Sequence, residues 1–257
     1  MPSCTAPKLF LIGVPLLAGV VYILPVCAQD MSAKPDGVVE LYTSQGCGSC
    51  PPADAVLKEL ATEGKVVALA FHVNYWDYRG WTDSLALPEN TERQTEYRDA
   101  LGLNGIYTPQ AILNGREHVN GQDGTKIRRR IADMRDTASG LTVPVSIEKT
   151  AKRRLLIDIG SGPVTANPVR VLLAYVNRES IVAIPDGENV GRKVSYANSV
   201  RAVETVGMWD GTAQKIEIPL SELASKKASG CAVLLQEMLG DGKPGPIIGA
   251  SILTEKP

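Results

Sequence analysis

Two cysteines separated by two residues, Cys47 and Cys50, have the type and spacing best suited to chemistry in this chain. At the start of a helix, this spacing lets both sulfur atoms come within bonding distance inside one turn. The first sulfur then lies near unpaired amide groups and the positive end of the helix dipole, which favours its thiolate. A thiolate attacks disulfides, and the second thiol resolves the mixed disulfide that forms. The spacing therefore predicts a Cys47–Cys50 disulfide that takes part in thiol–disulfide exchange.

Two other interpretations of the pair stay open. A zinc site usually has four ligands, and His72 and His118 could complete one with the two cysteines. A purely structural disulfide is the other alternative, although so short a loop constrains the unfolded chain little. The redox interpretation is favoured over both, with neither a metal nor another cofactor expected. We expect Cys47, as the nucleophile, to be more exposed than Cys50.

A strand and a helix are predicted on the two sides of this motif. Residues 38–43 are nearly all β-formers, and after Cys50 apolar residues recur at helical spacing until Gly64. Alternation of strands and helices over the following residues predicts a central sheet with helices on its faces. The later elements are a buried strand at 66–73, a helix at 88–101, strands at 110–113 and 117–120 joined by an Asn114-Gly115 hairpin turn, and a helix capped by Asp123.

From residue 141 the chain changes to period-two alternation of apolar and polar residues. Val143, Val145 and Ile147 alternate with Pro144 and Ser146, and similar segments follow as far as residue 253. Strands of this kind, with Gly, Pro and Asn turns between them, predict a β-sandwich. We therefore expect two domains, an α/β domain at residues 36–140 and an all-β, sandwich-like domain at residues 141–257.

The first 28 residues have the features of a secretory signal peptide. A basic start at Lys8 precedes a short apolar stretch, and small residues stand before a polar boundary after Ala28. The apolar stretch is shorter than the roughly 20 residues that a membrane-spanning helix needs. A lipoprotein anchored at Cys27 is disfavoured because bulky Val26 precedes that cysteine. We therefore expect a periplasmic or secreted protein with no stable membrane span in the mature chain.

Composition and charge exclude some classes of function. Of the 257 residues, 44% are hydrophobic and 21% are charged, which is enough apolar material for a packed core. Lys and Arg number 27 and Asp and Glu 28, and no basic run is longer than Arg128–Arg130. This distribution lacks the basic footprint that nucleic-acid binding requires.

The motif and its surroundings resemble a known family. The segment from Val38 to Ser139, with Cys47-Gly48-Ser49-Cys50, resembles a thioredoxin-fold domain, in which Thr108-Pro109 would be a cis-proline facing the dithiol. The larger pattern is similar to a bacterial secreted family known as domain of unknown function 1223. The stretches that carry this resemblance are Glu40–Cys47, Phe71–Asp77, Tyr107–Gln110 and Gly187–Asn189. The resemblance implies a thioredoxin-like fold, with Thr108 and Pro109 in contact with substrate.

Several other residues are candidates for a role beside the cysteines. Trp76 and Asp77 follow the second strand, where the carboxyl ends of strands meet ligands. They are predicted to line a substrate groove, with Asp77 exchanging a proton with the resolving thiol; packing of an aromatic loop is the alternative. We interpret His72 as a core histidine, Cys231 as a small buried apolar residue, and residues 187–192 as an exposed turn or an interdomain contact.

The function expected from the sequence is that of an exported thiol–disulfide oxidoreductase. Its substrates would be protein thiols and disulfides, and a separate redox partner would recycle the Cys47–Cys50 pair. A non-catalytic secreted binding protein with a structural disulfide is the alternative, together with a metal-binding protein that uses the same two cysteines.

Overall fold

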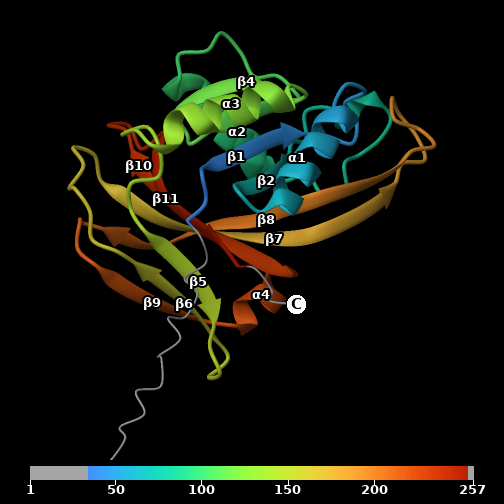
Figure 1. Ribbon diagram of the computed structural model, residues 1–257. Coiled ribbons are helices and arrows are strands. Elements are labelled where there is room, and N and C mark those ends of the chain that lie inside the picture. The colour runs from blue at the N-terminus through green and yellow to red at the C-terminus, as the bar shows by residue number, and fades with distance from the viewer. Residues whose placement is uncertain (1–33, 254–257) are drawn as a thin grey trace, which may run out of the picture. The chain divides into compact units, whose positions relative to one another are not determined.

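The computed structural model describes residues 34–253, so the predicted signal peptide at residues 1–28 lies outside the described range. The described chain is a mixed α/β protein in which a large sheet is combined with few helices (Figure 1). Among these residues no helix is both long enough and apolar enough to cross a membrane.

The elements around the cysteines form a parallel strand–helix–strand unit. Strand β1 (Val38–Thr43) leads through the cysteine loop into helix α1 (Pro51–Glu63), and strand β2 (Val67–His72) returns beside β1. Every residue of both strands is buried, as expected for nearly continuous apolar runs in a parallel pair. The register places Thr43 beside His72 at the carboxyl ends of the two strands.

The next elements extend the sheet on the other side of β1 and cover its faces. Helix α2 (Pro88–Ala100) precedes strands β3 (Gln110–Leu113) and β4 (Glu117–Asn120), which pair in antiparallel fashion next to β1. The hairpin turns at Asn114 and Gly115, both with positive φ, as the sequence predicts. Helix α3 (Gly124–Arg135) begins after Asp123, whose side chain accepts a hydrogen bond from the Lys126 amide, which confirms the predicted cap.

The second half of the chain contributes strands to two sheets. Strands β5 (Val145–Lys149), β6 (Arg154–Ile159) and β9 (Gln214–Pro219) form a small three-stranded sheet, and the short helix α4 (Ser221–Ser225) follows it. Strands β7 (Val169–Ala183), β8 (Lys193–Trp209), β10 (Gly230–Met238) and β11 (Pro244–Ile252) join the large sheet. Its order is β11-β10-β7-β8-β2-β1-β3-β4.

The expected division into two domains at residue 140 is wrong, because residues of both halves share a sheet and a core. Strand β8 pairs with β2 at Ser199 and Ala70, and the described residues belong to one compact unit. One apolar core combines Phe71 of the first half with Leu172 and Leu234 of the second. Period-two alternation predicts strands but does not reveal which strands pair, so the sequence could not show this continuity.

The sandwich-like packing expected for the second half does occur within this larger arrangement. A separate apolar cluster lies between the small sheet and the large one, with Ile157 from β6 and Leu173 and Val233 from β7 and β10. One layer of this sandwich is therefore part of the eight-stranded sheet rather than of an independent domain.

Candidate functional site

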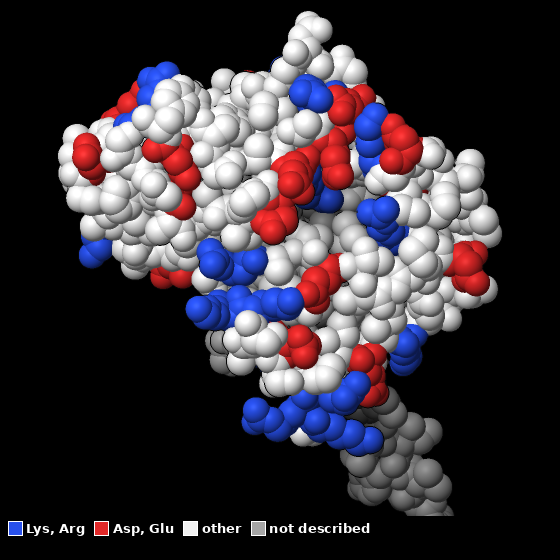
Figure 2. All heavy atoms as spheres, turned by 180° about the vertical axis from the view of Figure 1, so that it is seen from behind, with Lys and Arg blue, Asp and Glu red and all other residues white. Residues whose placement is uncertain are grey.

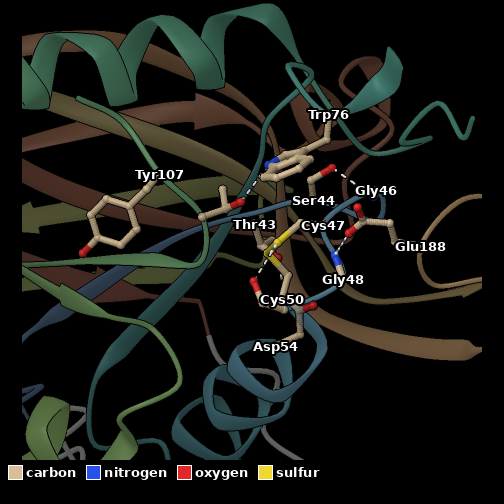
Figure 3. Close-up of a disulfide and its surroundings, with 12 residues drawn as sticks. Thr43, Ser44, Gly46, Cys47, Gly48, Cys50, Asp54, Trp76, Tyr107 and Glu188 are labelled. Atoms are coloured by element: carbon tan, nitrogen blue, oxygen red, sulfur yellow. Dashed lines mark hydrogen bonds between the residues drawn. A yellow bond between two sulfur atoms is a disulfide. The ribbon is translucent and has the colours of Figure 1, made fainter. Parts of the chain in front are cut away.

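The two cysteines form a disulfide in the loop that joins β1 to α1 (Figure 3). Their Cα atoms are 5.4 Å apart, and the Cys50 amide donates a hydrogen bond to the Cys47 carbonyl across the turn. Cys50 is the N-cap residue of α1, and Pro51 and Pro52 occupy the first turn. Proline fits there because amides of the first helical turn have no partner within the helix. The motif thus lies between a strand and a helix, as predicted.

Both cysteines are buried, so Cys47 exceeds Cys50 in exposure, as predicted, only by a negligible amount. Their exposed fractions are 1% for Cys47 and 0% for Cys50. The segment that connects β7 to β8, residues 184–192, contacts the cysteine loop, and we call it the cap segment. Asn189 in this segment is buried, and its Nδ2 donates hydrogen bonds to the carbonyls of Gln45 and Cys47, each at 2.9 Å.

A second residue of the cap segment holds the cysteine loop from the side. The Glu188 carboxylate accepts a hydrogen bond from the Gly48 amide at 2.9 Å (Figure 3). It also pairs with the guanidinium of Arg79. A Cβ atom on residue 48 would lie 2.7 Å from the carboxylate, so glycine is needed for this close approach. The predicted contact of residues 187–192 therefore exists, and it is made to the cysteine motif itself.

A buried carboxyl group, Asp54, stands one helical turn after Cys50. Its amide donates to the Cys50 carbonyl, and its Oδ1 accepts from the Thr43 hydroxyl at 2.7 Å. Its Oδ2 is buried with no hydrogen-bond partner. Burial raises the pKa of Asp54 to about 7, against the opposing effects of nearby His72 and the Thr43 hydrogen bond. The sequence analysis assigned no role to Asp54. Its position on the apolar face of α1, beside Ala53 and Leu57, was a feature of the sequence that could have indicated a buried carboxyl group.

His72 is a core histidine, held by a buried contact with the Asp83 carboxylate. Its Nδ1 lies 2.8 Å from Oδ2 of Asp83, and both side chains are completely buried. Burial by itself would raise the pKa of Asp83, but His72 and hydrogen bonds from the Gln45 and Leu85 amides bring it below its ordinary value. The same carboxylate thus ties β2 to the loop that precedes Cys47.

The predicted residues Trp76 and Thr108 contact each other, and Trp76 lies beside the cysteine loop. The Thr108–Pro109 peptide bond is cis, as predicted. Trp76 Nε1 donates a hydrogen bond to the Thr108 hydroxyl at 2.7 Å, and the Trp76 side chain packs against Gly46, next to Cys47 (Figure 3). Trp76 therefore connects the cis-proline turn with the cysteine loop.

Asp77 contacts the loop that follows β2, and its predicted proton exchange with Cys50 stays a prediction. Its Oδ1 accepts a hydrogen bond from the Asp83 amide, and partial burial raises its pKa. It therefore braces the loop after β2. The carboxyl group one helical turn from Cys50 belongs to Asp54.

The residues considered for a metal site do not form one. His72 pairs with Asp83, and Nδ1 of His118 hydrogen-bonds to the Tyr107 hydroxyl at 2.9 Å. Within residues 34–253, no three His, Cys, Asp or Glu side chains are placed so that they could hold a metal ion. Cys231 is buried in β10, and burial raises the pKa of its thiol to about 12.

A cavity in the described part of the chain lies away from the cysteines. It has a volume of about 390 Å³ and opens between α2 and strands β7, β8 and β10, with Arg93, Arg170 and Arg201 in its lining. Figure 2 shows acidic and basic side chains interspersed over one face of the protein. Neither cysteine lines the cavity, so the candidate site is the capped disulfide rather than an open pocket.

Fold and site together define a mixed α/β protein with a capped Cys-X-X-Cys disulfide between a strand and a helix. The chain belongs to the family described as protein of unknown function (DUF1223), which it matches over residues 38–236. It is also similar to the crystal structure of an Agrobacterium tumefaciens protein solved as a structural-genomics target. That protein is 50% identical, with a TM-score of 0.79 over 87% of this chain and 97% of the other. No curated protein matches the chain.

Proposed function

We propose that this protein is an exported thiol–disulfide oxidoreductase that acts on protein substrates through Cys47 and Cys50. The observation that carries the proposal is the buried Asp54 carboxyl, which has an unpaired oxygen and a raised pKa one turn after Cys50. A carboxyl that titrates near neutral pH can take and return the proton of a neighbouring thiol.

The strand order supports a thioredoxin-like arrangement. Parallel β2 and β1 are followed by antiparallel β3 and β4, and the Cys-X-X-Cys motif joins β1 to α1. The four stretches that carry the family resemblance also converge, since Cys47, Trp76, Thr108 and Asn189 are linked through one set of contacts. A thioredoxin-like domain embedded in a larger sheet is the fold we infer.

The proposed reaction starts from the reduced protein. The Cys47 thiolate attacks one sulfur of a substrate disulfide, a Cys47–substrate bond forms, and the other substrate sulfur leaves and takes a proton from solvent. Cys50 gives its proton to Asp54 and attacks Cys47, and the second substrate sulfur leaves with that proton. Two electrons and two protons thus pass to the substrate, and the Cys47–Cys50 disulfide remains. The reverse sequence oxidises a substrate dithiol, and a second dithiol or disulfide protein restores the starting state.

Trapping of mixed disulfides tests this reaction. Cys50→Ser leaves no resolving thiol, so it should accumulate disulfides between Cys47 and exported proteins, seen as bands that reductant removes. Cys47→Ser should trap far less, and Cys231→Ser serves as the matched control because that thiol is buried elsewhere. Equal trapping by the two motif variants would contradict the assigned roles.

The mass of the amino terminus of the exported chain tests cleavage after Ala28, and a lipid on Cys27 would contradict it.

A structural disulfide in a non-catalytic secreted binding protein is the second candidate. The burial of both cysteines and the hydrogen bond from Asn189 of the cap segment to the Cys47 carbonyl favour it. Equilibration with dithiol buffers of known potential separates the two candidates. A reduction potential below about -300 mV is typical of a structural disulfide, whereas a higher value indicates a reactive pair.

A further inference from the structure

The cap segment contacts the cysteine motif through a side-chain amide and a carboxylate, which are groups that a polypeptide partner also carries. Its two contacts with the motif are an amide bound to the carbonyls of Gln45 and Cys47, and a carboxylate bound to the amide of Gly48. A peptide segment lying across the motif would use the same kinds of group. The cap segment thus occupies the surface next to Cys47 that a substrate needs.

The Glu188 carboxylate occupies a site whose donor groups are arranged to bind an anion. Arg79 supplies its charge, and the guanidinium lies 5.0 Å from the centre of the Trp76 ring and 5.4 Å from that of Tyr78. These ring contacts, with a hydrogen bond from Arg79 Nε to the Tyr78 hydroxyl, hold Arg79 independently of Glu188. The Gly48 amide supplies the second donor. Both donors therefore remain in place when another carboxylate replaces Glu188.

In the closed state of the cap segment, one buried polar atom lacks a hydrogen-bond partner. The Oδ1 atom of Asn189 is buried and has no hydrogen-bond partner, and burial of an unpaired amide oxygen is unfavourable. Tyr78, which contacts Arg79, and Val190, which belongs to the cap segment, are 76% and 61% exposed. A partner that opens the cap segment would replace the Glu188 carboxylate with one of its own and would gain apolar contacts with Tyr78 and Val190.

We propose that Glu188 and Asn189 hold the cap segment closed over Cys47, and that a protein partner opens it by placing an acidic side chain between Arg79 and the Gly48 amide. The preferred substrate is then a polypeptide with Asp or Glu near its reacting cysteine. A ligand shifts a conformational equilibrium only through its differential affinity for the two states, and the Arg79–Gly48 site supplies that difference. This proposal rests on the proposed redox function for its substrate, but closure of the cap segment can be measured without it.

Alkylation of Cys47 tests the closure. The chain is reduced, treated with iodoacetamide, and the modified cysteine is identified by mass spectrometry. Glu188→Gln keeps the shape of the side chain but removes its charge, and we expect Cys47 to react roughly tenfold faster, with a similar gain for Asn189→Ala. Asp186→Asn is the matched control, because Asp186 bonds only to the Gly187 amide within the cap segment. Wild-type rates in both test variants would overturn the closure.

Two test peptides then decide the chemistry of the partner. Each carries one cysteine activated as a disulfide with an aromatic thiol, and they differ by Glu or Gln two residues away. In the Cys50→Ser chain, the Cys47 thiolate attacks the peptide sulfur and the coloured aromatic thiolate leaves. We expect the Glu peptide to react roughly tenfold faster, and Arg79→Gln to make the two rates equal. Equal rates with Arg79 intact would overturn the acidic partner. The activated disulfide of the peptide reacts with any accessible thiol, whatever the reduction potential of the Cys47–Cys50 pair. A reduction potential typical of a structural disulfide would therefore refute the proposed redox function without changing the outcome of this experiment.

Discussion

At the scale of single residues, Asp54 links the chemistry of the motif to the stability of the protein. Burial raises its pKa to about 7 in the folded chain, from an ordinary value of 3.8. Between these two pH values the folded protein holds a proton on Asp54 that the unfolded chain has released. Stability from this group is therefore fully present below about pH 4, falls as the pH rises, and is lost above about pH 7.

Asp54→Asn should remove this pH dependence. Asparagine keeps an oxygen that can accept from the Thr43 hydroxyl but carries no charge at any pH. One pKa unit corresponds to about 1.4 kcal/mol, so relative to wild type the variant should gain a few kcal/mol in free energy of unfolding between pH 4 and pH 8. Urea unfolding of the oxidised proteins across this range measures it. A difference that does not change with pH would show that Asp54 is already ionised in the folded state.

The residues of the site differ in how far the sequence revealed them. The Cys47–Cys50 pair and the cis bond before Pro109 follow from local spacing and from the family resemblance, and the structure contains both. Asp54 has a local signal, its place on the apolar face of α1, whereas the cap residue Asn189 depends on contacts with a distant part of the chain. Asn189 lies 142 residues from Cys47 in sequence, and no local pattern predicts such a contact.

At the scale of the elements, the turn between β3 and β4 ties the two halves of the sheet together through Asn114. Its Oδ1 accepts a hydrogen bond from the Val38 amide at 2.7 Å, and its backbone carbonyl accepts one from the Ile247 amide at 2.8 Å. Its φ of 49° lies in the left-handed region, which asparagine tolerates better than most residues.

Two substitutions at this turn should separate the side-chain bond from the backbone conformation. Asn114→Gly keeps the positive φ but leaves the buried Val38 amide without its partner, at a cost of about 1–3 kcal/mol. Asn114→Ala loses the same bond and also strains the backbone, at a further cost of about 1–2 kcal/mol. The free energy of unfolding, measured in urea, should therefore decrease from wild type to Gly to Ala. An alanine variant as stable as the glycine variant would show that the turn conformation contributes little.

Strands and helices of the first half follow closely from the sequence because short-range signals fix them. Pro51 and Gly64 mark the two ends of α1, and Asp123 marks the start of α3. Strand β7 continues beyond Val176 into residues that are largely polar and carry little strand signal. Its distal part is stabilised by pairing with β8, a tertiary contact that residue patterns do not contain.

At the scale of the whole molecule, a buried polar network joins the two halves of the chain. Glu40 of β1 is completely buried and pairs with Arg93 of α2. Arg93 also donates to the Gln236 side chain of β10 at 2.9 Å, and Gln236 donates to the Tyr97 hydroxyl at 2.7 Å. A buried charge needs such partners, so removal of β10 would leave this network incomplete.

The described chain should therefore unfold as one cooperative unit, and residues 36–140 should not fold alone. Without the second half, Val38, Phe71 and Ile112 lose the apolar partners supplied by Leu172 and Leu234. The large apolar area left in water should leave the fragment without fixed tertiary packing. Near-UV circular dichroism and urea unfolding of the fragment, with the full mature chain as the control, measure this. The full chain should show a single transition, with coincident curves from different probes. A fragment with a native near-UV spectrum and a sharp transition of its own would contradict the single unit and would restore the domain boundary at residue 140.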